Sequence, residues 1–295
     1  MKHTGPVVDE VDGFEVIDCK VCKFKHVHPI PTDEELGELY AAEFYSKKKP
    51  NYLKDSEEDI DWWMETYKNY FKLIGEHTKG KKLLDIGSGP GYFIKCGEKL
   101  GFDVTGVEPS KDAAVYSKKM GLKVINAYFD MELAREIGKF DIVTMNLVLE
   151  HIPDPTSFLK AIQTVLKPNG ILFLLSPNDY NPFQMILKND LGFKPWWVSP
   201  MQHINYFDFY SVTKLLKRVG FVPEEITTTY PMELFLLSGD NYIGKREVGR
   251  KCHKKRKEFE MNLLAGNPDL FNKFYRSLAR DGIGREFIII AKKKS

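Results

Sequence analysis

Residues 83–91 read LLDIGSGPG, and this stretch decides the fold. An apolar run of strand length leads directly into three glycines at alternate positions, and residues 92–100 then follow a helical pattern. Glycines let the chain turn sharply off a buried strand and let a ligand lie against the backbone. The stretch therefore predicts a strand, a tight binding turn and a helix, which is the first unit of an α/β sheet.

Downstream of this turn, segments of strand length alternate with segments of helix length. The predicted strands are residues 82–86, 103–107, 123–126, 140–146, 171–176, 222–228 and 285–291. The predicted helices are residues 57–75, 92–100, 111–120, 155–166 and 210–219, with a turn at 167–170 and further helix over 232–280. Residues 177–209 show no periodicity that assigns an element. Strands separated by helices of this length form βαβ units, so the chain predicts an α/β fold with helices on both faces of a parallel sheet.

An acidic residue, Glu108, stands at the end of the second predicted strand, at the same edge of the sheet as the glycine turn. A carboxylate there can accept hydrogen bonds from both hydroxyls of a ribose. Asp85, directly before the turn, would repel a pyrophosphate and suits a ligand with an ammonium or sulfonium group. The turn lacks the Lys-Ser/Thr of a phosphate-binding P-loop and reads Gly-x-Gly-x-Gly, which disfavours nucleoside triphosphates and dinucleotides.

Four segments, in order and with ordinary spacing, resemble motifs of class I S-adenosylmethionine (SAM)-dependent methyltransferases. They are LLDIGSGPG at 83–91, VEPS at 107–110, FDIVTMNLVLEHIPDP at 140–155 and LKPNGILFLLSPN at 166–178. The segment GREFIIIAKK at 284–293 is similar to the antiparallel strand that ends that fold. The resemblance implies a Rossmann-like sheet of seven strands, mostly parallel with the last strand antiparallel, and SAM as the cofactor.

The resemblance also implies which residues bind the cofactor. Asp85 and the turn backbone would hold the methionine part of SAM, Glu108 the ribose, and Asn146 would face the methionine end near the departing methyl. Ala127 and Tyr128 would line the adenine. The full predicted cofactor set is Asp85, Gly87, Ser88, Gly89, Gly91, Glu108, Pro109, Ala127, Tyr128 and Asn146.

Two histidines are candidate catalytic bases that would remove a proton from the methyl acceptor. His151 follows the fourth core strand, and His203 lies in PMQHINYF, which resembles the segment of small-molecule methyltransferases that closes over the acceptor. An imidazole titrates near neutrality and suits this role, although each histidine has a purely structural alternative in its loop. Ubiquinone biosynthesis O-methyltransferases have a Glu-x-x-Glu-His pattern linked with metal binding. Leu147 replaces its first carboxylate here, which argues against metal-dependent quinol methylation.

The N-terminal leader, residues 1–45, contains Cys19-x-x-Cys22 followed by His26 and His28. Cysteine and histidine are zinc ligands, but this spacing is tight for tetrahedral closure and the chain has no second Cys-x-x-Cys. We therefore predict two buried thiols or a vestigial knuckle and no metal, with zinc on Cys19, Cys22 and His26, or His28 in its place, as the alternative. The leader resembles that of bacterial methyltransferases linked with cell-surface sugars and secondary metabolites.

The predicted organisation has four parts. They are the Cys-x-x-Cys leader at 1–45, a helical lid at 46–80, the methyltransferase core at 81–231 and 283–295, and a helical cap at 232–282. A capped helix start is expected at 32–40 and a polar break at 47–51. The aromatic stretch at 62–71 is interpreted as a helix packed over the cofactor mouth, with core as the default for such a stripe. The stretch at 195–197 is interpreted first as core, and alternatively as an apolar wall or a sugar-stacking platform. Eight Lys or Arg between 245 and 257 are interpreted as a solvated helix face, or alternatively as attraction for an anionic acceptor or acidic lipid headgroups.

The composition excludes several classes of protein. In 295 residues, 43% hydrophobic and 28% charged side chains exclude general disorder. No apolar run reaches the roughly 18 residues of a membrane helix, so no membrane span is expected. The net charge of +2 argues against a protein that coats nucleic acid. Four cysteines make no disulfide scaffold and the N-terminus has no apolar signal core, so we expect a cytoplasmic protein.

These features predict SAM-dependent methyl transfer to a small-molecule or glycan acceptor, at oxygen, with histidine base assistance. If the basic stretch attracts the acceptor, an anionic acceptor is expected. An RNA or protein methyltransferase is one alternative, although Asn146-Leu147-Val148-Leu149 stands where base amino-methylating enzymes have an Asn/Asp-Pro-Pro-Tyr type of motif. A non-catalytic cofactor-binding subunit is the other, and the intact GSGPG turn argues against it. The sequence predicts no oligomeric state.

Overall fold

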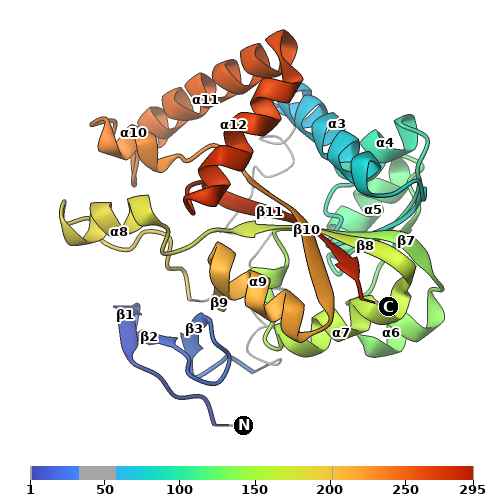
Figure 1. The fold of residues 1–295 in the computed structure, drawn as a ribbon, viewed down its shortest axis with the longest axis horizontal. Helices are drawn as coiled ribbons and strands as arrows, with labels where there is room; N and C mark the ends of the chain where they lie inside the picture. Colours follow the sequence, from blue (N-terminus) through green and yellow to red (C-terminus); the bar gives the residue numbers. More distant parts are fainter. Residues whose placement is uncertain (1, 33–57, 201, 295) are drawn as a thin grey trace. The chain divides into compact units, whose positions relative to one another are not determined.

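The computed structural model describes residues 2–32, 58–200 and 202–294 (Figure 1). The predicted helix start at 32–40, beyond Thr32 itself, and the predicted break at 47–51 lie outside the described residues. The chain divides into two compact units. Unit 1 comprises Met1–Ile30, Leu175–Lys214 and Glu225–Ile288, and unit 2 comprises Pro31–Leu174, Leu215–Glu224 and Ile289–Ser295.

The larger sheet has seven strands and confirms the predicted α/β architecture. Its strands are β4 (Lys82–Ile86), β5 (Asp103–Val107), β6 (Val124–Ile125), β7 (Phe140–Asn146), β8 (Leu166–Pro177), β10 (Phe221–Thr228) and β11 (Glu286–Lys293). The strand order is β10-β11-β8-β7-β4-β5-β6, with parallel pairing of β4 to β5 and β7 and of β5 to β6. The sheet is mixed, with an antiparallel end, as the sequence predicts.

The register of the central strands sets the position of the site. Asp85 on β4 pairs with Gly106 on β5 and with Thr144 on β7. Leu83 and Leu84 are fully buried, because a central parallel strand is covered on both faces. The carboxyl ends of β4, β5 and β7 therefore meet at one edge, where sheets of this kind bind ligands.

Helices follow most of these strands in unit 2. The predicted core helices are present within a few residues as α4 (Tyr92–Lys99), α5 (Lys111–Lys119) and α7 (Pro155–Val165), and α9 (Phe209–Arg218) precedes β10. The short helix α6 (Met131–Glu136) and the 3-10 helix η2 (Leu149–His151) were not predicted. Side-chain caps fix several starts. Ser110 Oγ accepts from the N–H of Ala113, and Asp154 Oδ1 accepts from that of Ser157 at 3.0 Å.

The aromatic stretch at 62–71 lies on α3 (Ile60–His77) and packs into the core of unit 2. The Phe71 ring lies 4.6 Å from that of Phe93 on α4, and Tyr70 lies 5.3 Å from Phe173 on β8, both measured between ring centroids. This confirms the core interpretation of the stripe. The lid function of 46–80 stays a prediction.

The predicted boundaries of two strands, β8 and β6, are wrong. The predicted turn at 167–170 is already part of β8, which begins at Leu166. This segment belongs to a strand that is hydrogen-bonded to β7, and a Cβ on Gly170 would lie 3.1 Å from the carbonyl oxygen of Asp141 on β7. β6 is shorter than predicted, at two residues, and it is the last strand of the sheet on its side.

Unit 1 contains a second sheet that the sequence did not predict. Its strands are β1 (Val7–Val11), β2 (Phe14–Asp18), β3 (Lys25–His28) and β9 (Asn205–Tyr206), in the order β1-β2-β3-β9 with antiparallel pairing. Its buried core consists of Val16, Val27, Trp197, Val198 and Tyr206. The core interpretation of Trp197 is therefore confirmed.

The remaining helices of unit 1 are α8 (Pro182–Asn189), α10 (Glu233–Leu237), α11 (Arg246–Gly266) and α12 (Pro268–Arg280). Helices α11 and α12 pack together, with the Tyr275 hydroxyl donating to Glu260 Oε1 at 2.8 Å. Among the helices of the described ranges, none has the length and apolar character that a membrane crossing needs.

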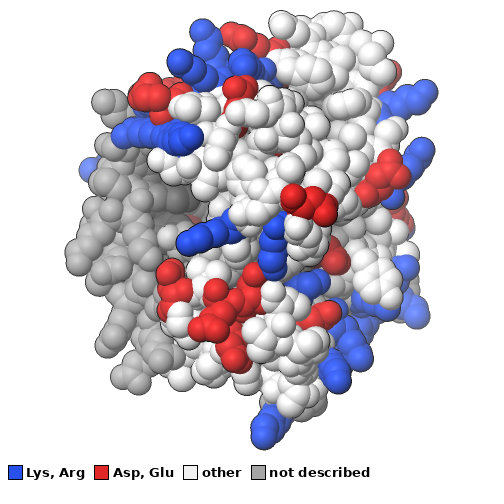
Figure 2. Space-filling model, turned by 90° about the vertical axis from the view of Figure 1, so that its left-hand side faces the viewer, with Lys and Arg blue, Asp and Glu red and all other residues white. Residues whose placement is uncertain are grey.

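The basic stretch begins just before α11, and three of its cations have acidic neighbours. Lys254 lies 3.9 Å from Glu258, Lys255 lies 3.1 Å from Asp240, and Arg256 lies 3.3 Å from Glu260. Figure 2 shows Lys and Arg interspersed with Asp and Glu on the face that it presents. The pairs of Lys254 and Lys255 are exposed and support the interpretation as a solvated helix face, whereas Arg256 and Glu260 are largely buried. Attraction of an anionic acceptor or of acidic lipid headgroups stays a prediction.

Candidate active site

The glycine turn after β4 has a backbone that side chains would obstruct. Gly87, Gly89 and Gly91 have φ angles of 72°, 52° and 83°, in the left-handed region that favours glycine. A Cβ on Gly87 would lie 2.5 Å from Cγ2 of Val148. The N–H of Gly87 donates to the carbonyl oxygen of Val107 at 2.8 Å, which fixes the turn to the end of β5. The turn is therefore rigid and presents bare backbone at the carboxyl edge of the sheet.

Glu108 is buried and locks the turn to the next helix. One carboxylate oxygen accepts from the N–H of Gly89 and the other from that of Ser110, both at 2.8 Å. Burial raises the pKa of Glu108, and these two hydrogen bonds lower it in part. Each oxygen keeps a lone pair, so the carboxylate can still accept hydroxyl hydrogens from a ligand.

Sequence reasoning missed Asn126, which lies directly after β6. Its Nδ2 donates to the carbonyl oxygens of Glu108 and Pro109, at 2.8 and 3.1 Å. Asn126 therefore holds the Glu108–Pro109 backbone in place. Its position at the end of a strand on the ligand-binding edge was the one signal that the sequence offered.

Asp85 is the most perturbed acid of the site. Its side chain is buried, and Oδ1 accepts from the Thr144 hydroxyl at 2.7 Å. Burial raises the pKa of Asp85 to about 7, and the neighbouring Glu108 adds to the rise, while hydrogen bonds from Thr144 and Asn146 oppose it. A cationic ligand would favour the ionised form. Thr144 was also missed from the sequence, because only the register of β4 against β7 places it there.

Two buried side-chain oxygens indicate whether the residues at this edge of the sheet suit SAM as a ligand. Ser88 Oγ and Asn146 Oδ1 are buried without a hydrogen-bond partner among the described residues. Ser88 lies in the turn that follows β4, the strand of Asp85, and Asn146 ends the neighbouring strand β7. Two buried carboxylates, two oxygens that need donors and a bare glycine turn suit a ligand with an ammonium group and ribose hydroxyls, which SAM has.

The predicted adenine residues follow β6. Ala127 is half-buried, and Tyr128 is 64% exposed, so its ring is accessible to a ligand. Pro109 lies between Glu108 and the cap of α5. The contacts of these three residues with a cofactor stay predictions.

His151 ends the 3-10 helix that follows β7. Its Nε2 lies 3.7 Å from Oε1 of the buried Glu150, and the imidazole itself is half-buried. Leu147, between β7 and this helix, has a φ of 58° and is 44% exposed. A bulky residue in the left-handed region costs about 1–2 kcal/mol, and such strain concentrates at functional sites.

The second candidate base, His203, belongs to unit 1, where its backbone N–H donates to the carbonyl oxygen of Ser199 at 2.8 Å.

Unit 1 also contains a buried polar cluster that the sequence did not signal. Arg285 Nη1 lies 3.7 Å from Oδ1 of Asp179 and 4.0 Å from Oε1 of Glu233. The same Glu233 oxygen accepts from Gln184 Nε2 at 3.1 Å. Asp179 and Glu233 are almost fully buried, and the opposite Glu233 oxygen has no hydrogen-bond partner in the described part of the chain.

The leader cysteines and one of its two candidate histidines also come together. Cys19, Cys22 and His26 lie with His3, which sequence reasoning missed, in a group whose ligand atoms are within 4.8 Å of one another. His28 is not in this group.

A family model described as a methyltransferase domain matches residues 52–226. A ubiquinone biosynthesis O-methyltransferase from Actinobacillus pleuropneumoniae is 35% identical over 120 residues, which cover 37% of this chain and 51% of that protein. The chain thus spans about half the length of the relatives that it matches.

Two solved structures share the fold. One is a SAM-dependent methyltransferase from Archaeoglobus fulgidus, with 18% identity, 77% of this chain and 93% of that chain covered and a TM-score of 0.51. The other is a 1,6-didemethyltoxoflavin N1-methyltransferase from Burkholderia thailandensis with S-adenosylhomocysteine bound, with 15% identity, 99% and 100% covered and a TM-score of 0.53. The chain belongs to the methyltransferase domain family, and these two structures share its fold.

Proposed function

We propose that this protein transfers a methyl group from SAM to an oxygen atom of a polar small-molecule or glycan acceptor. One observation supports this most strongly. The candidate base His151 follows Asn146 at the carboxyl end of β7, beside the strand whose end positions Asp85 and the glycine turn. A titratable imidazole at this edge has the chemistry that an acceptor hydroxyl requires.

The bound cofactor would supply a methyl group that its sulfonium charge already activates. Asp85 would orient the ammonium of the methionine part, and Glu108 would accept the ribose hydroxyls while its other contacts hold the turn. His151, or His203, would take the proton from the acceptor hydroxyl as the new oxygen–carbon bond forms and the bond between the methyl carbon and sulfur breaks, which leaves S-adenosylhomocysteine. General-base assistance of this kind contributes roughly 10²- to 10⁴-fold in rate.

The preference for oxygen comes from the relatives named as O-methyltransferases. The fold alone does not select the acceptor atom, since one structural neighbour is named as an N-methyltransferase.

The test combines calorimetry with a transfer assay. Binding of S-adenosylhomocysteine is measured first, for the wild type and for His151→Ala, His203→Ala and the control His253→Ala. Transfer of radiolabelled methyl from SAM to sugar nucleotides, phosphoglycans and polar small molecules is then scored by chromatography. We expect all four proteins to bind the cofactor product equally. We also expect at least one of the two candidate variants to lose at least about 100-fold in turnover.

Each contrary outcome has a defined meaning. Label that enters only the RNA or protein fraction of a cell extract would contradict the acceptor class. Turnover that survives in both histidine variants would show that the acceptor needs no histidine base. Tight binding of S-adenosylhomocysteine without transfer to any fraction would favour the non-catalytic alternative.

A further inference from the structure

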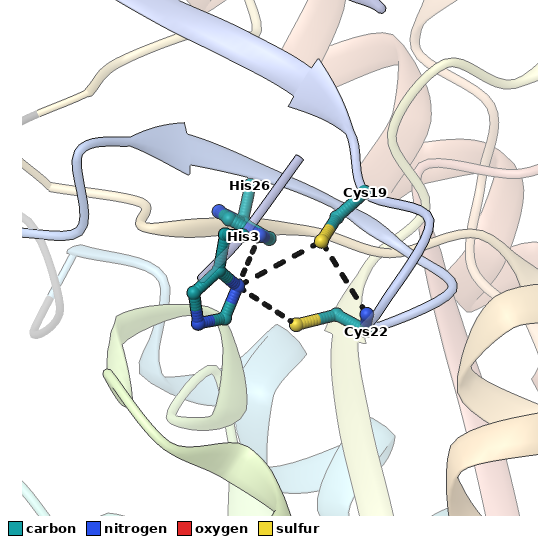
Figure 3. Close-up of side chains that lie close together, drawn as sticks. All are labelled: His3, Cys19, Cys22 and His26. Carbon is teal, nitrogen blue, oxygen red and sulfur yellow. Dashed lines mark hydrogen bonds between the residues drawn. The ribbon is translucent and has the colours of Figure 1, made fainter. Parts of the chain in front are cut away.

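Four side chains of the N-terminal sheet converge on one point, as Figure 3 shows. They come from three segments: His3 precedes β1, Cys19 and Cys22 lie in the connection between β2 and β3, and His26 lies on β3. Nitrogen and sulfur are the ligand atoms that all four offer. All four residues belong to unit 1.

The three separations measured from His3 Nδ1 are close to the edges of a metal-centred tetrahedron, and all the ligand atoms lie within 4.8 Å of one another. His3 Nδ1 lies 3.1 Å from His26 Nε2, 3.2 Å from Cys22 Sγ and 3.7 Å from Cys19 Sγ. Zinc bond lengths give tetrahedral edges of about 3.3 Å between two nitrogens and about 3.6 Å between nitrogen and sulfur. The observed distances differ from these edges by a few tenths of an ångström.

A hydrogen bond to the backbone orients the His26 ring so that its Nε2 faces the cluster. His26 Nδ1 lies 2.7 Å from the carbonyl oxygen of Val27. A carbonyl can only accept, so Nδ1 bears the hydrogen and Nε2 presents its lone pair to the cluster. This second hydrogen bond is the usual companion of a metal-ligating histidine, because it fixes both the tautomer and the ring orientation.

The loop from Cys19 to Lys23 directs the sulfur atoms of both cysteines toward the cluster. The N–H of Cys22 donates to Cys19 Sγ at 3.4 Å, and the N–H of Lys23 donates to the carbonyl oxygen of Cys19 at 2.9 Å. Lys23 has a φ of 66°, in the left-handed region. The loop therefore keeps a strained backbone, and an N–H donor to sulfur stabilises the thiolate that a metal requires.

His3 reaches the cluster because its segment lies against the end of β2. The N–H of Lys20 donates to the carbonyl oxygen of Thr4, and that of Asp18 to Pro6, each at 2.9 Å. A Cβ on Gly5 would lie 2.0 Å from the carbonyl oxygen of Asp18, so this close approach requires glycine. The fourth ligand is thus held by built contacts between distant parts of the sequence.

We propose that His3, Cys19, Cys22 and His26 bind one zinc ion. Two sulfurs and two imidazole nitrogens select zinc over magnesium or calcium, which prefer oxygen ligands. Four protein ligands leave no open coordination position, so the ion is structural rather than catalytic. It ties the N-terminal segment to the β2–β3 hairpin.

The ion also has a consequence for the segment that contains His203. On β3, His26 pairs with Asn205 of β9, and the N–H of Val27 donates to the carbonyl oxygen of Ile204 at 2.9 Å. Loss of the metal is therefore expected to loosen β9 and the residues directly before it. Zinc binding itself does not depend on the proposed methyl transfer.

The experiment measures zinc content and cobalt spectra of the full-length protein purified under reducing conditions. We expect one zinc per chain by elemental analysis. After zinc removal, cobalt(II) should give the intense visible bands of a tetrahedral site with sulfur charge transfer. Cys22→Ser and His3→Ala should weaken zinc affinity by at least about 100-fold.

Two matched variants serve as controls. His28→Ala removes the other leader histidine and Cys252→Ser removes a buried thiol elsewhere in unit 1, and both should keep the zinc. His3 lies in the terminal segment, so its variant is expected to fold, and the cobalt titration needs no variant at all. Wild-type protein that binds neither zinc nor cobalt would overturn the proposal, as would zinc retained in Cys22→Ser. A Cys19–Cys22 disulfide by mass spectrometry, with no metal bound after reduction, would also overturn it.

Discussion

Cofactor affinity is expected to rise with pH from about pH 6 to about pH 7.5, and Asp85 is the group responsible. Burial raises the pKa of this carboxyl to about 7 in the protein without ligand. An ammonium group bound beside Asp85 would lower that pKa, because opposite charge favours the ionised form. Binding therefore releases a proton wherever Asp85 is still protonated, and affinity increases as the pH rises toward 7.

The magnitude follows from the ionised fraction of Asp85. With a pKa of about 7, the carboxyl is about 9% ionised at pH 6 and about 76% ionised at pH 7.5. The apparent affinity for the ligand should then be about eightfold weaker at pH 6 than at pH 7.5, which corresponds to about 1.2 kcal/mol in binding free energy. The window stops at about pH 7.5 because the amino group of the ligand begins to lose its own proton above that pH.

The assay is calorimetric titration of S-adenosylhomocysteine at several pH values, in buffers with different enthalpies of ionisation. The buffer dependence of the heat counts the protons released, which should approach one per site at pH 6. Asp85→Asn keeps the shape of the side chain and should show weaker binding that no longer depends on pH in this window. A wild-type affinity that is flat or falls between pH 6 and pH 7.5, or proton uptake on binding, would refute the reasoning.

Three further predictions concern the same edge of the sheet. The pKa of Asp85 in the folded protein lies above its ordinary value, so its ionisation destabilises the ligand-free fold as the pH rises from about 4 to about 7. The variant Asp85→Asn should therefore be about 2–4 kcal/mol more stable than the wild type at pH 8. Equal melting curves of the two proteins at that pH would contradict this. Glu108→Ala should weaken binding of S-adenosylhomocysteine by about 1–3 kcal/mol, because charge-assisted hydrogen bonds are lost, and unchanged affinity by calorimetry would remove the ribose assignment. Gly87→Ala should lower the free energy of unfolding by at least about 1–2 kcal/mol, because the residue has a φ of 72° and the new Cβ would lie 2.5 Å from Val148 Cγ2. Thermal unfolding measures this. Gly138→Ala serves as the control, because Gly138 also has a positive φ but its Cβ would contact nothing.

Several elements of the core could be predicted from local sequence. The bounds of β4, β5 and β7 agree with the predicted strands at 82–86, 103–107 and 140–146. Each is an apolar run with glycine or polar residues at its end, and a buried parallel strand needs no further signal. The glycine turn and Glu108 were found in the same way, because their chemistry is local to the ends of these strands.

Helix α8 lay within reach of sequence reasoning but was not predicted. Asn181 caps it, and the side chain of Gln184 reaches back to the N–H of Asn181, which completes a capping box with Pro182 at the first turn. The helix has only eight residues and follows a stretch without periodicity. Its start signal was present, while its hydrophobic pattern was too short to be recognised.

The sequence by itself determined the larger sheet, the glycine turn and the two acids of the candidate cofactor site, since strand patterns and glycine positions are properties of neighbouring residues. The tertiary structure alone decided which distant groups complete the sites. Thr144 reaches Asp85 through the register of β4 against β7, and His3 joins Cys19 across 16 positions of the chain. Such partners depend on long-range pairing and close backbone approach, which leave no periodic trace in the sequence.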